Sequence, residues 1–183
     1  MNLTRLYHEG AAARFWYDDT HAALHLLLGE RDGDMMLAFL AATSPRANLR
    51  ANVAKAMRAF TQWKEGEPYT FPGHFPAHRG NLTRAAFHIP LRGPKVKAFH
   101  AALTGDPDAV VLDVWMLRIL NLPDRPTRAQ WAQGERTVRR LAKRLNEQPR
   151  RVQAALWIAY KRRIEGPGST VADYQTLIRE HTT

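Results

Sequence analysis

The stretch IPLRGPKVKAFHAALTGDPDAVVLDVWMLRIL, residues 89–120, decides how the chain can fold. Its first seven residues, IPLRGPK, set two prolines and a glycine between helix-like segments, which is typical of a tight hairpin between two helices. Lys95 begins the second helix, KVKAFHAAL, which is apolar on one face. Because Gly93 allows close approach to the backbone, the hairpin N–H groups and the helix N-terminus together predict a phosphate-binding position.

Asp113 is the single charge in the apolar run AVVLDVWML, and it follows a second turn, TGDPDA. An aspartate directly before an apolar helical segment is typical of a helix N-cap, because its side chain accepts a hydrogen bond from a free backbone N–H. The residues by themselves therefore predict a capping role for Asp113.

The rest of the sequence shows helical spacing of apolar residues and almost no alternating strand pattern, so we expect an all-α fold. We expect a single domain over residues 1–183, with the hairpin and the Asp113 segment at about 79–120 and the C-terminal helices at about 127–181. Asp34 and Thr127 are the predicted N-caps. Turns or irregular connections are expected at 29–34 and 65–78. Helices are expected at 10–28, 35–43, 48–63, 81–87, 95–103, 114–120, 127–145, 151–163 and 169–181.

The composition excludes several kinds of site. The chain has no cysteine, which removes disulfides, thiolate zinc sites, iron–sulfur clusters and cysteine nucleophiles, and we expect no metal site and no cofactor. Its longest apolar stretches fall short of the ~20 residues that a membrane helix needs, and residues 1–10 lack the pattern of an export signal. These features favour a cytoplasmic monomer that does not bind membranes.

Charge is distributed in blocks. The net charge is +10, but residues 44–100 carry ten basic and two acidic residues, and 127–166 carry eleven and three, while the segments around them are slightly acidic. Clustered Lys and Arg on a domain are typical of a protein that binds a polyanion, because neutralising phosphates releases condensed counterions. A basic surface kept for solubility is the alternative that charge alone leaves open.

The order and spacing of these features resemble the helix-hairpin-helix DNA glycosylase superfamily. That family has a Leu-Pro-Gly-Val-Gly-x-Lys hairpin, a helix, and then an aspartate in Val-Asp-x-His-Val-x-Arg, and in many members the lysine precedes the aspartate by eighteen residues. Here IPLRGPK ends in Lys95, and LDVWMLR carries Asp113 eighteen residues later and Arg118 at the matching interval. Upstream, GHFPAHRGNLTRAA and LAATSPRAN are similar to the segment before the hairpin and to a loop that enters DNA.

The resemblance implies roles for individual residues. Asp113 would stabilise the positive charge that develops on the deoxyribose as the glycosidic bond breaks, and Lys95 would be a nucleophile that forms a Schiff base. Lys95 as a simple phosphate contact is the alternative. Phe99 and Trp115 would line the pocket of a flipped base, or fill the core. The residues expected to contact double-stranded DNA are Arg46, Arg79, Asn81, Arg92, Gly93 and Lys97.

The expected function is therefore removal of a modified or mismatched base from DNA, and a Schiff base at Lys95 would add strand cleavage at the resulting abasic site. Two alternatives remain at the level of the sequence: an enzyme of the same fold that transfers a group to a modified base, and a DNA-binding module without catalysis. The histidine pairs of HAALH (21–25) and HFPAH (74–78) are interpreted as solvated surface residues. Trp131, Trp157 and Tyr160 are assigned to the core, and the run KRR at 161–163 to a solvated helix end.

Overall fold

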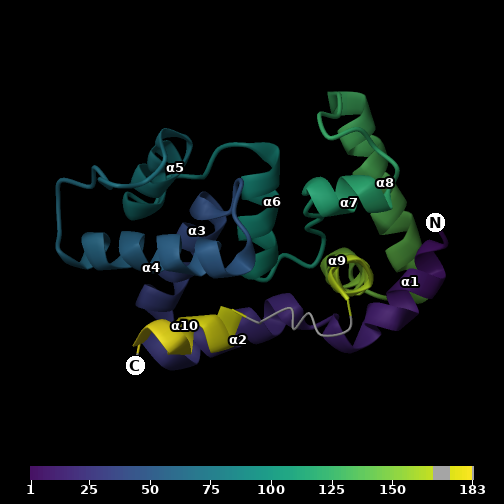
Figure 1. The fold of residues 1–183 in the computed structure, drawn as a ribbon, viewed down its shortest axis with the longest axis horizontal. Helices are drawn as coiled ribbons and strands as arrows, with labels where there is room; N and C mark the ends of the chain where they lie inside the picture. Colours follow the sequence, from purple (N-terminus) through teal and green to yellow (C-terminus); the bar gives the residue numbers. More distant parts are fainter. Residues whose placement is uncertain (167–173, 183) are drawn as a thin grey trace. The chain divides into compact units, whose positions relative to one another are not determined.

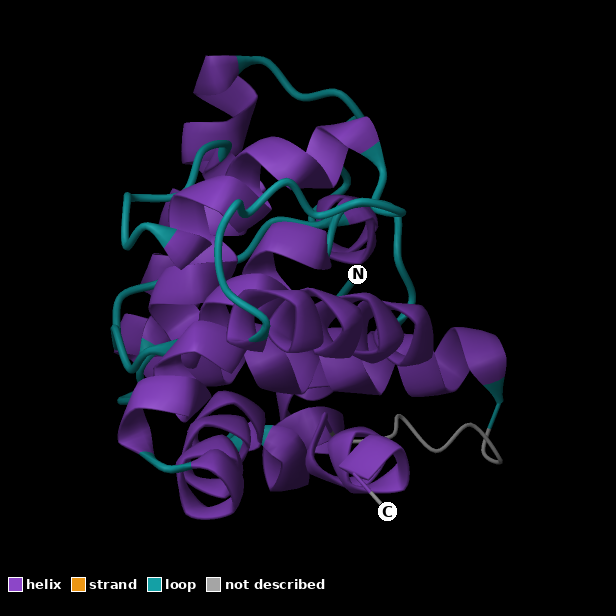
Figure 2. Ribbon diagram, turned by 90° about the vertical axis from the view of Figure 1, so that its left-hand side faces the viewer, coloured by secondary structure: helices purple, strands orange, loops and turns teal. Residues whose placement is uncertain are grey.

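The computed structural model describes residues 1–166 and 174–182, and these residues form helices and loops without any strand, which confirms the all-α prediction (Figures 1 and 2). Within this described part, no helix is both long and apolar enough to cross a membrane. The helices in chain order are α1 (Leu3–Gly10), the 3-10 turn η1 (Ala11–Ala13), α2 (Trp16–Leu28), α3 (Glu30–Thr43), α4 (Leu49–Lys64), α5 (Pro76–Ala86), α6 (Pro94–Leu103), α7 (Val114–Ile119), α8 (Arg128–Leu145), α9 (Pro149–Glu165) and α10 (Tyr174–Thr182).

The described residues divide into two compact units, each built from two separate stretches of chain. Residues 1–19 and 105–166 belong to unit 1, and residues 20–104 and 174–182 belong to unit 2. The division falls inside α2, and α3 to α6 and α10 lie wholly in unit 2. The expectation of a single domain stays a prediction.

Unit 1 is organised around α9, which packs against α1, α7 and α8. Its apolar core includes Leu6 from α1, Met116 from α7, Val138 from α8 and Leu156 from α9, all fully buried. α1 approaches α9 at a glycine: a Cβ atom on Gly10 would lie only 2.0 Å from the carbonyl oxygen of Ala155. The absence of a side chain at that position thus allows the two helices to touch along their backbones.

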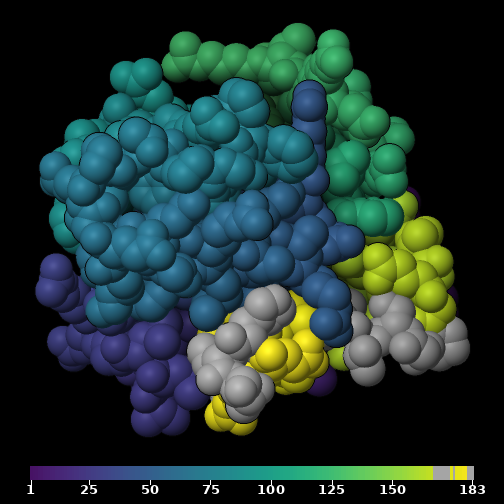
Figure 3. Space-filling view, turned by 60° about the vertical axis from the view of Figure 1, so that its left-hand side comes forward, coloured from purple at the N-terminus to yellow at the C-terminus, as the bar shows by residue number. Residues whose placement is uncertain are grey.

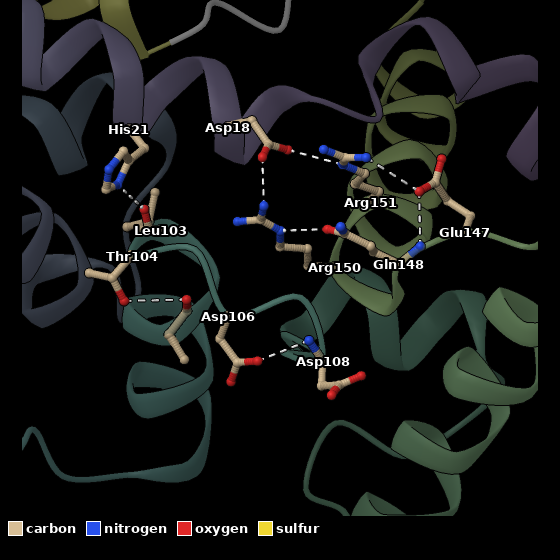
Figure 4. Close-up of polar contacts among 11 residues, drawn as sticks. Asp18, His21, Leu103, Thr104, Asp106, Asp108, Glu147, Gln148, Arg150 and Arg151 are labelled. Atoms are coloured by element: carbon tan, nitrogen blue, oxygen red, sulfur yellow. Dashed lines mark hydrogen bonds and ion pairs between the residues drawn. The ribbon is translucent and has the colours of Figure 1, made fainter.

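An ion-pair network also joins the start of α2 to α9 within unit 1 (Figure 4). The carboxylate of Asp18 accepts hydrogen bonds from Arg150 Nη2 at 2.5 Å and from Arg151 Nε at 3.2 Å. Arg150 is buried, with 7% of its surface exposed, and its Nε also donates to Gln148 Oε1 at 3.2 Å. A buried guanidinium needs such partners, because desolvation without them is costly.

Unit 2 is organised around α3, which packs against α4, α5 and α6. In the space-filling view of Figure 3, the blue segment of this unit, which includes α4, forms a broad part of the visible face. Residues 35–43 of α3 are all buried, which explains why this segment, MMLAFLAAT, carries no charge. α10 packs against α4, where Asn52 Nδ2 donates to the hydroxyl of the buried Tyr174 at 2.7 Å.

The predicted N-cap is confirmed at Thr127, which forms a capping box with Gln130. Asn48, the expected first residue of the helix at 48–63, is the N-cap of α4, and its side chain accepts a hydrogen bond from Ala51 N. The prediction at Asp34 is wrong, because α3 already begins at Glu30 after Gly29, whose φ of 79° makes the turn in one residue. Acidic residues in the first turn, at 30 and 32, favour this earlier start through the helix dipole.

Other boundaries differ from the prediction as well. The helix α1 was not predicted, and the helix expected over 10–28 is interrupted by η1 where Gly10 meets α9. α5 begins at Pro76 instead of residue 81, because proline at the first helical position has its φ already set for a helix. Of the helix predicted at 169–181, residues 169–173 lie outside the described residues.

Candidate nucleic-acid interface

The predicted hairpin is present between α5 and α6, and one side chain holds its shape. Asn81 Nδ2 donates to the carbonyl oxygen of Arg92 at 3.0 Å, and Arg92 N donates to Asn81 Oδ1 at 2.7 Å. Gly93 is the N-cap of α6 with a φ of 91°, a value that residues with a side chain rarely adopt. Pro94 then starts α6, so the hairpin backbone is fixed on both sides of Gly93.

The lysine of the hairpin connects α6 to the end of α3. Lys95 Nζ donates to the carbonyl oxygen of Ser44 at 3.0 Å. Ser44 begins the loop that carries Arg46, an exposed residue with a φ of 56°. Through this bond, two of the predicted DNA-contacting segments, the hairpin and the loop at 44–48, are held together within unit 2.

The remaining predicted contacts to DNA also lie in unit 2. Arg79, Arg92 and Lys97 are exposed, and Arg79 Nε donates to the carbonyl oxygen of His74 at 3.1 Å. All six predicted DNA-contacting residues therefore belong to the same unit as Lys95.

Asp113 caps α7, as its position before an apolar run predicted. Its Oδ1 accepts a hydrogen bond from Met116 N at 2.9 Å, and its Oδ2 accepts one from Trp157 Nε1 at 2.8 Å. With a donor on each oxygen, the carboxylate is held in one orientation. Trp157, which the sequence assigned only to the core, is thus a direct partner of the candidate catalytic group.

Trp157 links this carboxylate to a group of cations and aromatic rings, and we call Asp113, Trp115, Arg118, Trp157 and Lys161 the Asp113 cluster. The Trp115 ring has the Arg118 guanidinium at 5.1 Å and Lys161 Nζ at 5.8 Å from its centroid. Lys161 Nζ is also 5.0 Å from the Trp157 centroid. Lys161 is buried, so the interpretation of the run at 161–163 as a solvated helix end is wrong for this residue. Its spacing of four from Trp157 was the available signal, since such residues are neighbours on a helix.

The two predicted pocket residues belong to different units. Trp115 is half-buried in the Asp113 cluster of unit 1, and Phe99 is buried on α6 in unit 2, with its ring 6.4 Å from that of Tyr174. Lys95 and Asp113 are divided in the same way, Lys95 in unit 2 and Asp113 in unit 1. Each of the two candidate catalytic groups has hydrogen-bond partners within its own unit.

The histidines of HFPAH are buried, which corrects their interpretation as surface residues. Burial, together with the nearby cations Arg58, Arg79 and Lys55, lowers the pKa of His74 from 6.5 to about 4. Burial also lowers the pKa of His78, whose Nε2 donates to the carbonyl oxygen of Pro45 at 2.9 Å. Both rings are neutral at pH 7. Across the described residues, no group of three His, Asp or Glu side chains gathers in a way that could hold a metal ion.

Comparison with known proteins places the chain in a family. Residues 7–164 match the family described as "Family of unknown function (DUF7178)", and the chain belongs to it. No curated protein matches the chain, and no solved structure does.

Proposed function

We propose that the protein is a helix-hairpin-helix, glycosylase-like enzyme that removes a modified or mismatched base from double-stranded DNA. The observation that carries the proposal is the hairpin closed by Asn81 and Arg92, which ends in Lys95 and is followed eighteen residues later by an oriented carboxylate, Asp113. The exposed cations beside this hairpin suit a phosphate backbone.

The chemistry would begin with a flipped nucleotide, because a base inside a duplex is out of reach of any side chain. As the bond between C1′ and the base nitrogen breaks, positive charge develops on the sugar ring. The Asp113 carboxylate, kept in one orientation by Met116 N and Trp157 Nε1, would stabilise that charge without having to reorganise.

Lys95 would be the nucleophile that makes strand cleavage possible. Its amine, after losing a proton and leaving the Ser44 carbonyl, attacks C1′ as the base departs. Cleavage of the bond between C1′ and the ring oxygen, which takes up a proton, then gives a protonated imine. Borohydride reduces such an imine to a stable covalent adduct between protein and DNA.

The test of the glycosylase proposal uses duplexes that carry a panel of damaged and mismatched bases, followed by heating in alkali to cleave abasic sites. Asp113→Asn should abolish base release and preserve DNA binding, because asparagine caps a helix about as well as aspartate but carries no charge. Asp124→Asn, in an exposed loop, is the matched control and should leave base release unchanged. Full base release by folded Asp113→Asn protein would overturn the catalytic role.

Lys95 has its own control. Lys95→Gln should eliminate the borohydride-trapped adduct, whereas Lys64→Gln, at an exposed position at the end of α4 in the same unit, should retain it. Trapping by the Lys95→Gln protein would show that another amine attacks the sugar.

A second candidate function is a DNA-binding module without catalysis. The capping bond from Met116 N favours it, because capping alone is sufficient to explain an aspartate at position 113. Duplex binding by the wild-type protein, with no base released or altered across the whole panel, would support this module. Release of a base would exclude it, and an altered base that remains attached to its sugar would indicate group transfer.

A further inference from the structure

The outer face of α8 carries a dense group of cations. Its inner side, with Gly134, Val138, Leu141 and Ala142, is buried in unit 1. The exposed positions of the same helix carry six basic residues, which we call the α8 basic face: Arg128, Arg136, Arg139, Arg140, Lys143 and Arg144. The helix contains one acidic residue, Glu135.

Most of these cations have no counter-charge. Within the described residues, only Arg139 of the α8 basic face uses its side chain in an ion pair or hydrogen bond, with Glu135 at 3.7 Å and with the carbonyl oxygen of Asp108 at 3.1 Å. Elsewhere in unit 1, Arg5 and Arg163 both bind Glu9, and Arg150 and Arg151 both bind Asp18. Among the described residues, the other five cations of the α8 basic face lack the carboxylate partner that these four arginines have.

The spacing of the cations makes them repel one another. Arg136, Arg140 and Arg144 follow at intervals of four residues, and so lie in one row along the helix. Like charges at this spacing destabilise a helix. At a rise of about 1.5 Å per residue, the row extends over about 12 Å, a length of duplex that carries roughly seven phosphates. A polyanion laid along α8 would remove this repulsion.

The chemistry of the face favours nucleic acid over an anionic membrane. A helix that binds a membrane surface needs large apolar side chains directed into the lipid. The apolar side of α8 is already buried in unit 1, and none of the exposed large apolar residues of the described chain lies on α8. Five of the six cations are arginines, whose planar group suits two-pronged hydrogen bonding to phosphate.

We propose that the α8 basic face is a second surface for the DNA backbone, on unit 1, in addition to the hairpin on unit 2. It would bind duplexes of any sequence, because phosphates carry no base identity. The proposal rests on the proposed function only in taking duplex DNA as the ligand, and it does not require a base to be excised.

The test compares three variants of the full chain by fluorescence anisotropy with a labelled duplex that contains no lesion, at several salt concentrations. Arg136→Gln/Arg140→Gln/Arg144→Gln should weaken binding and lower the slope of log K against log salt by up to about 2.7, since each lost phosphate contact removes about 0.9. The same three positions changed to Lys keep the charge and should keep most of the slope. Unfolding curves would confirm that each variant is folded.

The matched control removes three arginines that already have a partner: Arg5→Gln/Arg31→Gln/Arg163→Gln. Arg5 and Arg163 pair with Glu9, and Arg31 lies 5.5 Å from the centre of the Trp63 ring. The net charge changes equally in both glutamine triples. Weaker binding in the α8 triple alone would therefore identify the α8 basic face as a DNA-binding surface and exclude the lower overall charge as the cause. Equal effects of the two triples, or no effect of the α8 triple, would overturn the proposal.

Two further results would distinguish a failure of the glycosylase proposal from a failure of the α8 proposal. If the wild-type protein releases no base while the α8 triple alone loses duplex binding, the excision function fails and the α8 surface stands. If the protein binds vesicles of phosphatidylserine and phosphatidylcholine through the α8 arginines and does not bind the duplex, the partner is a membrane and the inference is wrong.

Discussion

The contact between α1 and α9 gives a sharp test of the fold, because it depends on one missing side chain. Gly10→Ala places a methyl group 2.0 Å from the Ala155 carbonyl oxygen and 3.0 Å from the Ala159 Cβ, whereas non-bonded carbon atoms normally lie about 3.5–4.0 Å apart. The nearest obstacle is backbone, which cannot rotate away. We therefore take the upper part of the usual range for overpacking, about 3 kcal/mol, and subtract up to about 1 kcal/mol for the better helix propensity of alanine.

The expected net loss of about 2 kcal/mol in the free energy of unfolding corresponds to a fall in Tm of about 6 °C for a protein of this size. Urea denaturation followed by near-ultraviolet circular dichroism measures the loss. Gly80→Ala is the matched control: no atom lies within 4 Å of the added Cβ inside α5, so this variant should gain up to about 1 kcal/mol. Wild-type stability in folded Gly10→Ala protein would refute the close approach of α1 and α9.

Three other changes test individual interactions by the same denaturation assay. Trp157→Phe keeps an aromatic ring but removes the donor to the Asp113 carboxylate, so the free energy of unfolding should fall by about 2 kcal/mol. If the losses from Trp157→Phe and Asp113→Asn simply add in the double variant, the hydrogen bond between the two side chains is not formed. Asp18→Asn leaves the buried Arg150 without its counter-charge and should cost about 3 kcal/mol; unchanged stability would show that this ion pair is not formed. The pKa of His74 is about 4 in the folded protein against 6.5 in the unfolded chain, so the unfolded chain takes up the proton at higher pH. Stability should therefore be lost as the pH falls from about 6.5 to about 4, and the loss should be smaller in His74→Gln.

Local signals predicted much of the helical pattern. Thr127 and Asp113 each cap the helix that follows them, and both caps were predictable because the capping bond joins residues only three apart in the sequence. The start of α3 was missed because GERDGD resembles a turn in composition, although its acidic residues also suit a helix N-terminus.

Long-range contacts could not be predicted in this way. Trp157 reaches Asp113 from 44 positions along the chain, and a pattern of apolar spacing says only that its ring is inside. The burial of His74 and His78 likewise depends on α4 and the loop after α3, from which Lys55 and the Pro45 carbonyl approach them. The hairpin was predictable because its bond between Asn81 and Arg92 closes over only eleven residues, with proline and glycine marking the turn.

The composition of each unit from two separate stretches has a consequence for the order in which the chain can fold during synthesis. Residues 1–19 leave the ribosome well before α9, the helix they pack against, which follows more than a hundred residues later. Unit 2 is completed later still, because Tyr174, whose hydroxyl accepts the hydrogen bond from Asn52, is translated after α9. A nascent chain therefore carries incomplete apolar surface of unit 1 until α9 emerges and of unit 2 until α10 emerges, and chaperones would be expected to bind it during this interval.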